Sequence, residues 1–96
     1  MTAKERRNVL TLLDGHVSSI PEKLRSRLEQ LINEKIDVCK SQEFVNVNFV
    51  DGLIYERDAI LHNVSGSERN DSDFLAGRGQ VRQWLYGLRR GRVPRV

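Results

Sequence analysis

Apolar residues at helical spacing, behind a strong helix-start signal, constrain the fold of this chain more than any other sequence feature. Ser19 and Glu22 have the spacing of a capping box, and Pro21 sits in the first turn, where its missing N–H costs nothing. The apolar residues that follow recur at i, i+4, i+7, i+8 and i+12; they are Leu24, Leu28, Leu31, Ile32 and Ile36. The pattern predicts a helix at about 20–40 with one buried face.

A similar signal opens the chain. Thr2 and Glu5 again have the capping-box spacing, and Gly15 can take the left-handed position that often ends a helix. Between them, apolar residues recur at helical spacing, namely Val9, Leu10, Leu13 and Val17. We therefore expect a first short helix that ends near residues 14–15.

The last helix is predicted after a polar loop at residues 65–73, where Asp71 or Ser72 can serve as the cap. Its apolar face consists of Phe74, Val81, Leu85 and Leu88, with Trp84 beside it. Gly91 and Pro94 follow, so the helix should end after Leu88 and release an extended basic tail.

Two glycines interrupt this last helical pattern. Gly77 and Gly79 each cost about 1 kcal/mol relative to alanine in a helix, so they need a structural reason, and close approach of another backbone is the natural one. The segment resembles a phosphate-binding glycine loop only superficially, because no strand precedes it and no G-x-G-x-x-G pattern is completed. The predicted helix-packing residues are Phe74, Gly77, Val81, Trp84 and Leu85.

The segment from residue 43 to residue 64 is ambiguous. Residues 45–49 alternate like a half-buried strand, whereas Phe44, Val47, Val50, Ile54 and Leu61 recur like a helix. We favour a helix at about 43–63, loosened near residues 51–52, and the alternative is a strand at 44–50 before a helix at 52–62. The fold is then all-α, a small bundle of three to four helices in one domain (residues 1–88) with a basic C-terminal tail (residues 89–96).

Sites for metal chemistry or acid–base catalysis are not evident. Cys39 is the only cysteine, which excludes an internal disulfide and zinc-ligand spacing, and we expect it to be buried and inert. His16 and His62 have no cysteine or histidine nearby, so we place them at helix ends or in loops. The acidic residues Asp51, Glu56 and Asp58 cluster near Lys40 and Arg57, and we interpret them as solvated ion pairs. We expect no catalytic residues, no metal and no cofactor.

No segment approaches the roughly 18 consecutive apolar residues of a membrane span. The charged start at residues 4–7 is not followed by an apolar stretch, so we expect no signal peptide. These features predict no membrane partner and a protein that is intracellular or associated with a particle.

Charge is distributed unevenly along the chain. All 13 acidic residues precede Ala76, so residues 1–76, with ten basic residues, sum to −3, and residues 77–96 carry six arginines and no acid, a net charge of +6. We expect an acidic partner for the C-terminal part, either a protein groove, where Val93 and Val96 would add apolar anchors, or nucleic acid. The predicted partner-binding residues are Arg78, Arg82, Tyr86, Arg89, Arg90, Arg92, Val93 and Arg95, with Tyr86 on a different face from an inward-packing Trp84.

The stretch from Asp73 to Leu85 (DFLAGRGQVRQWL) resembles a pattern in small helical proteins encoded in tailed-bacteriophage structural-gene clusters. In that pattern an Asp-Phe pair leads into a Gly-Arg step and an apolar ending, after an upstream helix like residues 24–39. The resemblance implies a non-enzymatic virion or morphogenesis component, such as a minor head, portal-associated or head–tail joining protein. We expect such a component to be present in several copies in an assembly, and to be located in the virion or in the host cytoplasm. The resemblance assigns no role to any individual residue.

The function expected from the sequence is therefore that of a structural or adaptor protein of a phage particle, which docks on a portal, capsid or head–tail component. One alternative is a small protein that binds nucleic acid phosphates through its C-terminal arginines. Another is an inhibitor of a host protein.

Overall fold

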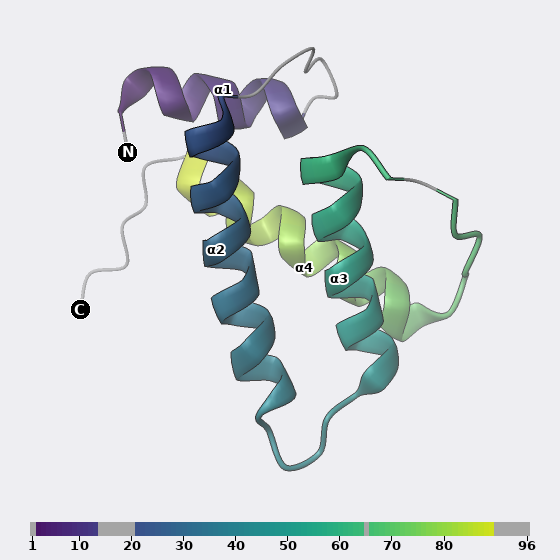
Figure 1. Cartoon of the computed structure of the whole chain (residues 1–96). Coiled ribbons are helices and arrows are strands. Elements are labelled where there is room, and N and C mark those ends of the chain that lie inside the picture. Colours follow the sequence, from purple (N-terminus) through teal and green to yellow (C-terminus); the bar gives the residue numbers. More distant parts are fainter. Residues whose placement is uncertain (1, 14–20, 65, 90–96) are drawn as a thin grey trace.

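Four helices follow one another in the computed structural model, which describes residues 2–13, 21–64 and 66–89 (Figure 1). They are α1 (Ala3–Leu13), α2 (Glu22–Lys40), α3 (Val47–His62) and α4 (Ser72–Arg89). The predicted all-α fold is confirmed. Within these ranges no strand occurs, so the alternative of a strand at 44–50 is wrong.

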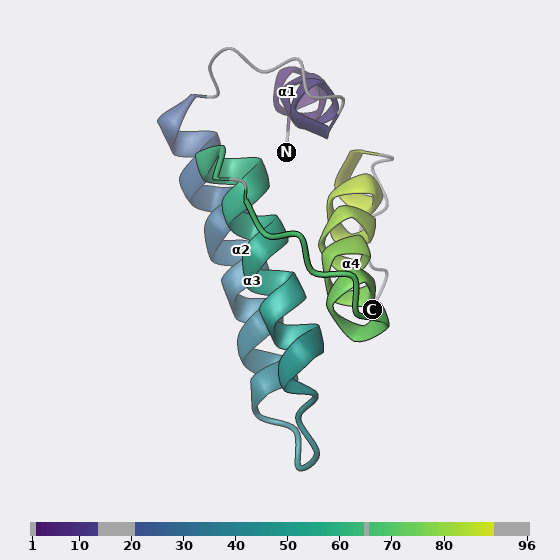
Figure 2. The same ribbon diagram turned by 90° about the vertical axis from the view of Figure 1, so that its right-hand side faces the viewer.

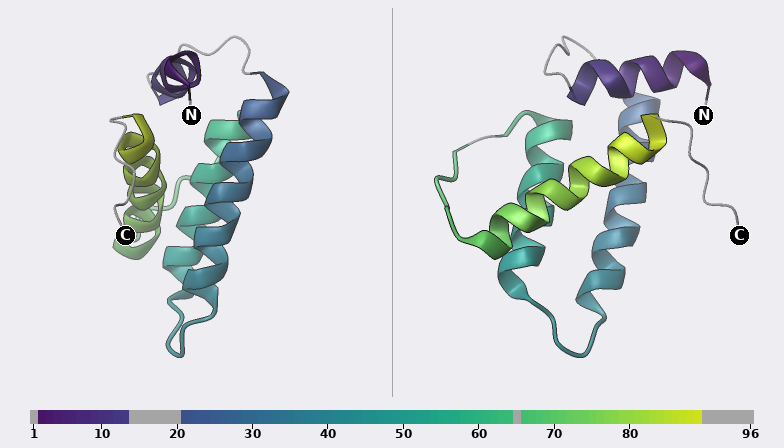
Figure 3. Two further views of the ribbon diagram at one scale, coloured as in Figure 1. Left: turned by 90° about the vertical axis from the view of Figure 1, so that its left-hand side faces the viewer. Right: turned by 180° about the vertical axis from the view of Figure 1, so that it is seen from behind.

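The helices form two layers with a cap at one end. The neighbouring helices α2 and α3 are joined by a turn and make one layer, and α4 crosses them on one side as the second layer (Figure 2). Helix α1 lies across the end opposite the α2–α3 turn and contacts α4 (Figure 3). No described helix has the length and apolar character needed to cross a membrane.

Side-chain caps start three of the four helices. The predicted Thr2–Glu5 capping box is confirmed, because the Glu5 N–H donates to Thr2 Oγ1 at 3.1 Å and the Thr2 N–H donates to Glu5 Oε1 at 3.2 Å. The N–H of Thr2 lowers the pKa of the Glu5 carboxyl below its usual 4.5, with help from Arg27. Asp71 caps α4, as predicted, by accepting the Phe74 N–H at 2.8 Å.

The other two starts differ from the expectation. Helix α2 begins at Glu22, and Pro21 is its N-cap rather than a first-turn residue; Ser19 lies outside the described residues. Helix α3 begins at Val47, four residues later than predicted, because Asn46 caps it by accepting the Phe49 N–H at 3.2 Å. The helix also continues through Gly52 without loosening. It ends at His62, and the C-cap residue Asn63 has a left-handed φ of 52°.

The core lies where the four helices meet. Its buried apolar side chains come from every helix: Val9, Leu24, Leu28, Ile32, Ile36, Val50, Leu53, Leu61, Phe74, Val81 and Leu85. The predicted stripe of α2 is thus buried apart from Leu31, which is half-buried. Phe44 and Val47, assigned to a buried stripe, are instead exposed by 88% and 65%, because the helix starts after Phe44 and turns Val47 away from the core.

Helices α3 and α4 cross where two glycines meet. A Cβ atom on Gly77 would overlap the carbonyl oxygen of Phe49 and lie 3.1 Å from the Gly52 Cα; a Cβ on Gly52 would overlap the carbonyl oxygen of Phe74. The expected close backbone approach therefore occurs at Gly77, against α3. A Cβ added to Gly79 would meet nothing within 4 Å, so the same expectation is wrong there.

Candidate functional site

A buried carboxylate joins α3 to α4 beside the glycine crossing. The Glu56 side chain is 3% exposed, and its two oxygens accept from Arg78 Nε at 2.9 Å and from Arg82 Nε at 2.7 Å. Arg78 also stacks over the Tyr55 ring, with 4.7 Å from its guanidinium carbon to the ring centroid. This arrangement satisfies a charge that would be costly to bury alone, and it fixes the two helices to each other.

The Glu56 contacts bear on two predictions. Arg78 and Arg82, which were predicted to bind a partner, both form an ion pair with the same internal carboxylate, and their role in partner binding stays a prediction. Glu56 was interpreted as one member of a solvated acidic cluster, but it lies on the buried face of α3, three residues after Leu53. The charge count along the chain missed this pairing because the partners are 22 and 26 residues apart.

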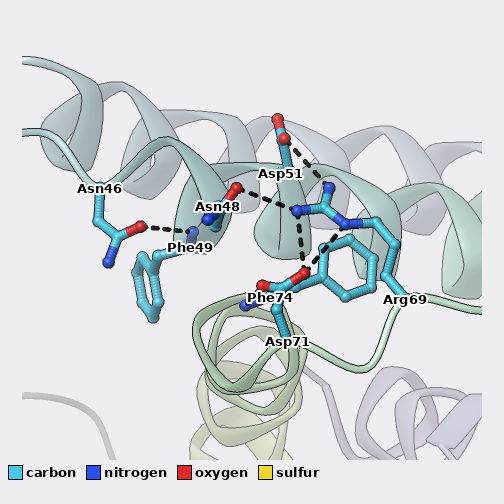
Figure 4. Close-up of polar contacts among 7 residues, drawn as sticks. All are labelled: Asn46, Asn48, Phe49, Asp51, Arg69, Asp71 and Phe74. Carbon is cyan, nitrogen blue, oxygen red and sulfur yellow. Dashed lines mark hydrogen bonds and ion pairs between the residues drawn. The ribbon is translucent and has the colours of Figure 1, made fainter.

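A second cluster fastens the loop before α4 to the start of α3. Arg69 lies 3.2 Å from Asp51 and 3.1 Å from Asp71, donates to Asn48 Oδ1 at 3.1 Å, and covers the Phe74 ring at 4.3 Å from its centroid (Figure 4). The hydrogen bond to Asp51 raises the pKa of Arg69 above its usual value, with Asp71 adding to the effect. The guanidinium thus has three polar partners and an aromatic ring within the protein, and it connects the loop before α4 to α3. We call these contacts the Arg69 clasp.

Tyr55 holds the same loop from α3. Its hydroxyl oxygen accepts the N–H groups of Gly66 at 3.1 Å and Ser67 at 3.3 Å, and its ring packs against Phe74 with centroids 5.4 Å apart. Sequence reasoning missed both Tyr55 and Arg69, because a polar loop carries no periodic signal that shows what binds it. The structure assigns them to loop anchoring.

The other predicted site residues lie in different surroundings. Trp84 is half-buried on the core with Lys35 Nζ 5.4 Å from its ring centroid. Tyr86, which was expected to be available to a partner, is also half-buried and packs on the core. It has a further interaction within the protein, so it is not without a partner. Arg89 is the last residue of α4. The remaining predicted partner residues, Arg90, Arg92, Val93 and Arg95, lie outside the described residues.

The described part of the chain contains no group of three or more His, Cys, Asp and Glu side chains that could hold a metal ion. Cys39 is half-buried against the core rather than fully buried. His62 ends α3, as expected, and its Nε2 lies 3.3 Å from Glu29 Oε2. His16 lies outside the described residues.

Apolar side chains are exposed at the turn between α2 and α3. Val38 in the last turn of α2 is 63% exposed, Phe44 88%, Val45 38%, and Val47 at the start of α3 65%. We call these four residues the apolar tip. None of the four belongs to the buried core, and the turn that joins α2 to α3 projects away from α1 and α4 (Figure 1).

Comparison with known proteins adds no identity to this geometry: no family model, no curated protein and no solved structure matches the chain.

Proposed function

We propose that the protein is a non-enzymatic adaptor that docks on another protein through the apolar tip. The observation that carries the proposal is the exposure of Phe44, which is 88% accessible and is flanked by three valines. Burying a side chain of this size contributes about 1.5–3 kcal/mol, and aromatic residues are enriched among the few positions that dominate interfaces. Because Phe44 is still exposed in the folded chain, its burial can contribute this free energy to the binding of a partner.

The kind of partner rests on the resemblance of residues 73–85 to phage structural-cluster proteins. In this chain Phe74, Gly77, Val81 and Leu85 are packing residues of α4, so the resembling pattern concerns the fold rather than the docking surface. We propose that the partner is a portal, capsid or head–tail component, and that several copies of the adaptor bind around it. Repetition would let one modest contact per copy hold the assembly together.

The experiment replaces the apolar tip while leaving the fold intact. Phe44→Ser combined with Val47→Ser should leave the melting temperature nearly unchanged, because both side chains are exposed. Val64→Ser is the matched control, since Val64 is also an exposed valine (53%) but lies beyond the other end of α3. Each variant is expressed from the genome that encodes the chain, and its copies per purified particle are counted by mass spectrometry.

We expect the tip variant to lose at least ten-fold in copies per particle and the Val64 variant to match the wild type. Equal incorporation of tip variant and wild type would reject the tip as the docking surface. Absence of the wild-type protein from particles, together with a soluble complex containing one host protein, would reject the particle adaptor and support the inhibitor alternative.

A further inference from the structure

Three chain segments that are distant in sequence meet at the end of the molecule opposite the apolar tip. Helix α1 lies across this end, α2 begins here, and α4 arrives here at its last turns (Figures 1 and 3). An ion pair of 2.7 Å between Arg27 and Glu5 joins α2 to α1, and α1 contacts α4.

Positive charge is concentrated at this end when the fold is taken into account. Residues 2–13 and 21–27 together carry six basic and two acidic residues, a net charge of +4. Residues 28–88 carry six basic and ten acidic residues, a net charge of −4. The molecule is thus far more polarised in space than its overall charge of +3 indicates.

The cations of α1 and the first turn of α2 differ from the described arginines elsewhere in having no acidic partner, a property that they share with Lys35 and Lys40. Lys4, Arg6, Arg7 and Lys23 are exposed, and none forms an ion pair with any residue that the structure describes. The described arginine side chains beyond residue 24 each have an acidic partner; they are Arg25, Arg27, Arg57, Arg69, Arg78 and Arg82. We call Lys4, Arg6, Arg7 and Lys23 the basic end.

We propose that the basic end binds the phosphate backbone of a nucleic acid without reading its bases. Exposed cations on a regular helix suit phosphates, which need charge and reach rather than shape.

The test measures binding of the full chain to a fluorescein-labelled random 30-base-pair DNA duplex by anisotropy, over a series of salt concentrations. Arg7→Ala and Lys23→Ala each remove one cation of the basic end. Lys40→Ala is the matched control, because Lys40 is an exposed lysine without an ion pair among the described residues and lies at the α2–α3 turn. A chain shortened by residues 90–96 separates the helical cations from the later arginines.

Each phosphate contact contributes about 0.9 to the slope of log affinity against log salt on duplex DNA. We expect Arg7→Ala and Lys23→Ala each to lower the slope by about that amount, Lys40→Ala to leave it unchanged, and the shortened chain to keep a weaker, salt-dependent binding. Melting curves should be unaffected in the three alanine variants, since all three side chains are exposed. The double variant Phe44→Ser/Val47→Ser should bind DNA like the wild type, which keeps this test independent of the adaptor proposal.

The proposal is overturned if Arg7→Ala and Lys23→Ala behave like Lys40→Ala, because the helical cations would then make no contact. It is also overturned if polyglutamate competes with the duplex at equal charge concentration, which would indicate an acidic protein as the partner. Loss of all binding in the shortened chain would assign the interaction to residues 90–96 alone and remove the basic end as a surface.

Discussion

Adding one methyl group at the glycine crossing should weaken the fold, whereas the same change two residues later should strengthen it. In Gly77→Ala the new Cβ would overlap the Phe49 carbonyl oxygen and lie 3.0 Å from the Leu53 nitrogen, and all of these neighbours are backbone atoms of α3. Backbone inside a helix cannot rotate away as a side chain can. The helices must therefore separate, which loosens the packing of Leu53 and Val81 on both sides of the crossing.

The expected magnitude follows from two opposing effects. Overpacking a well-packed site costs about 1–3 kcal/mol, and more where no side chain can yield, while alanine in place of glycine gains about 1 kcal/mol of helix propensity. We expect a net loss of about 2 kcal/mol in unfolding free energy for Gly77→Ala, and a similar loss for Gly52→Ala. For a domain of this size that loss lowers the melting temperature by roughly 8–16 °C.

Gly79→Ala is the internal control, because it makes the same chemical change on the same helix with nothing within 4 Å. It should raise the unfolding free energy by about 0.5–1 kcal/mol. Thermal and urea unfolding, followed by circular dichroism at 222 nm, measure all three variants. A Gly77→Ala protein as stable as Gly79→Ala would refute the close crossing, since propensity alone would then explain both changes.

Three further predictions concern the core and its charges. Leu28→Ala and Leu85→Ala should each lower the unfolding free energy by roughly 2–4 kcal/mol, because both side chains are buried; an unchanged melting temperature in either would contradict the helix faces described above. Glu56→Gln should lower the unfolding free energy by about 1–2 kcal/mol, which is less than the loss of a fully buried ion pair. The reason is that Arg78 and Arg82 are 33% and 42% exposed, so that water can solvate them once the carboxylate is gone. A decrease above roughly 4 kcal/mol in urea unfolding would show that water does not reach them. Glu5→Gln keeps the capping geometry and removes the charge. Because the folded-state pKa of Glu5 is lowered, its carboxylate stabilises the fold above about pH 4.5, and this contribution disappears as the pH falls through the lowered pKa. The melting temperature of the wild type should therefore exceed that of the variant at pH 7 but not at about pH 2. A difference that stays constant with pH would contradict the role given to the Glu5 charge.

Much of the helical architecture is predictable from local sequence because its determinants are local. The Thr2–Glu5 box and the Asp71 cap act over three residues, and a capping residue three positions from its partner is visible in any single sequence. The start of α3 shows the limit. Helical spacing extended the predicted helix back to residue 43. The Asn46 side chain instead caps the first turn, so the helix begins after it and Phe44 is exposed in the preceding turn.

The candidate sites were less predictable because their determinants are tertiary. Gly52 carried the same signal as Gly77, a glycine within a helical pattern, but it was interpreted as a loose point because its neighbour in space is 25 residues away in sequence. Arg78 and Arg82 are four apart and so share a face of α4, but only the structure shows Glu56 opposite them.

The contacts between α3 and α4 also explain why the two proposed surfaces can act independently. Three sets of contacts fix this pair of helices: the glycine crossing, the Glu56 ion pairs and the Arg69 clasp on Phe74. The apolar tip lies at the start of α3, and α4 leads away from this pair to the basic end. Because the α3–α4 pair lies between the two proposed surfaces, we expect a partner at one end to leave the other end uncovered. An adaptor that joins a protein surface to a nucleic acid needs this separation, and changes at the two ends should therefore have additive effects on binding.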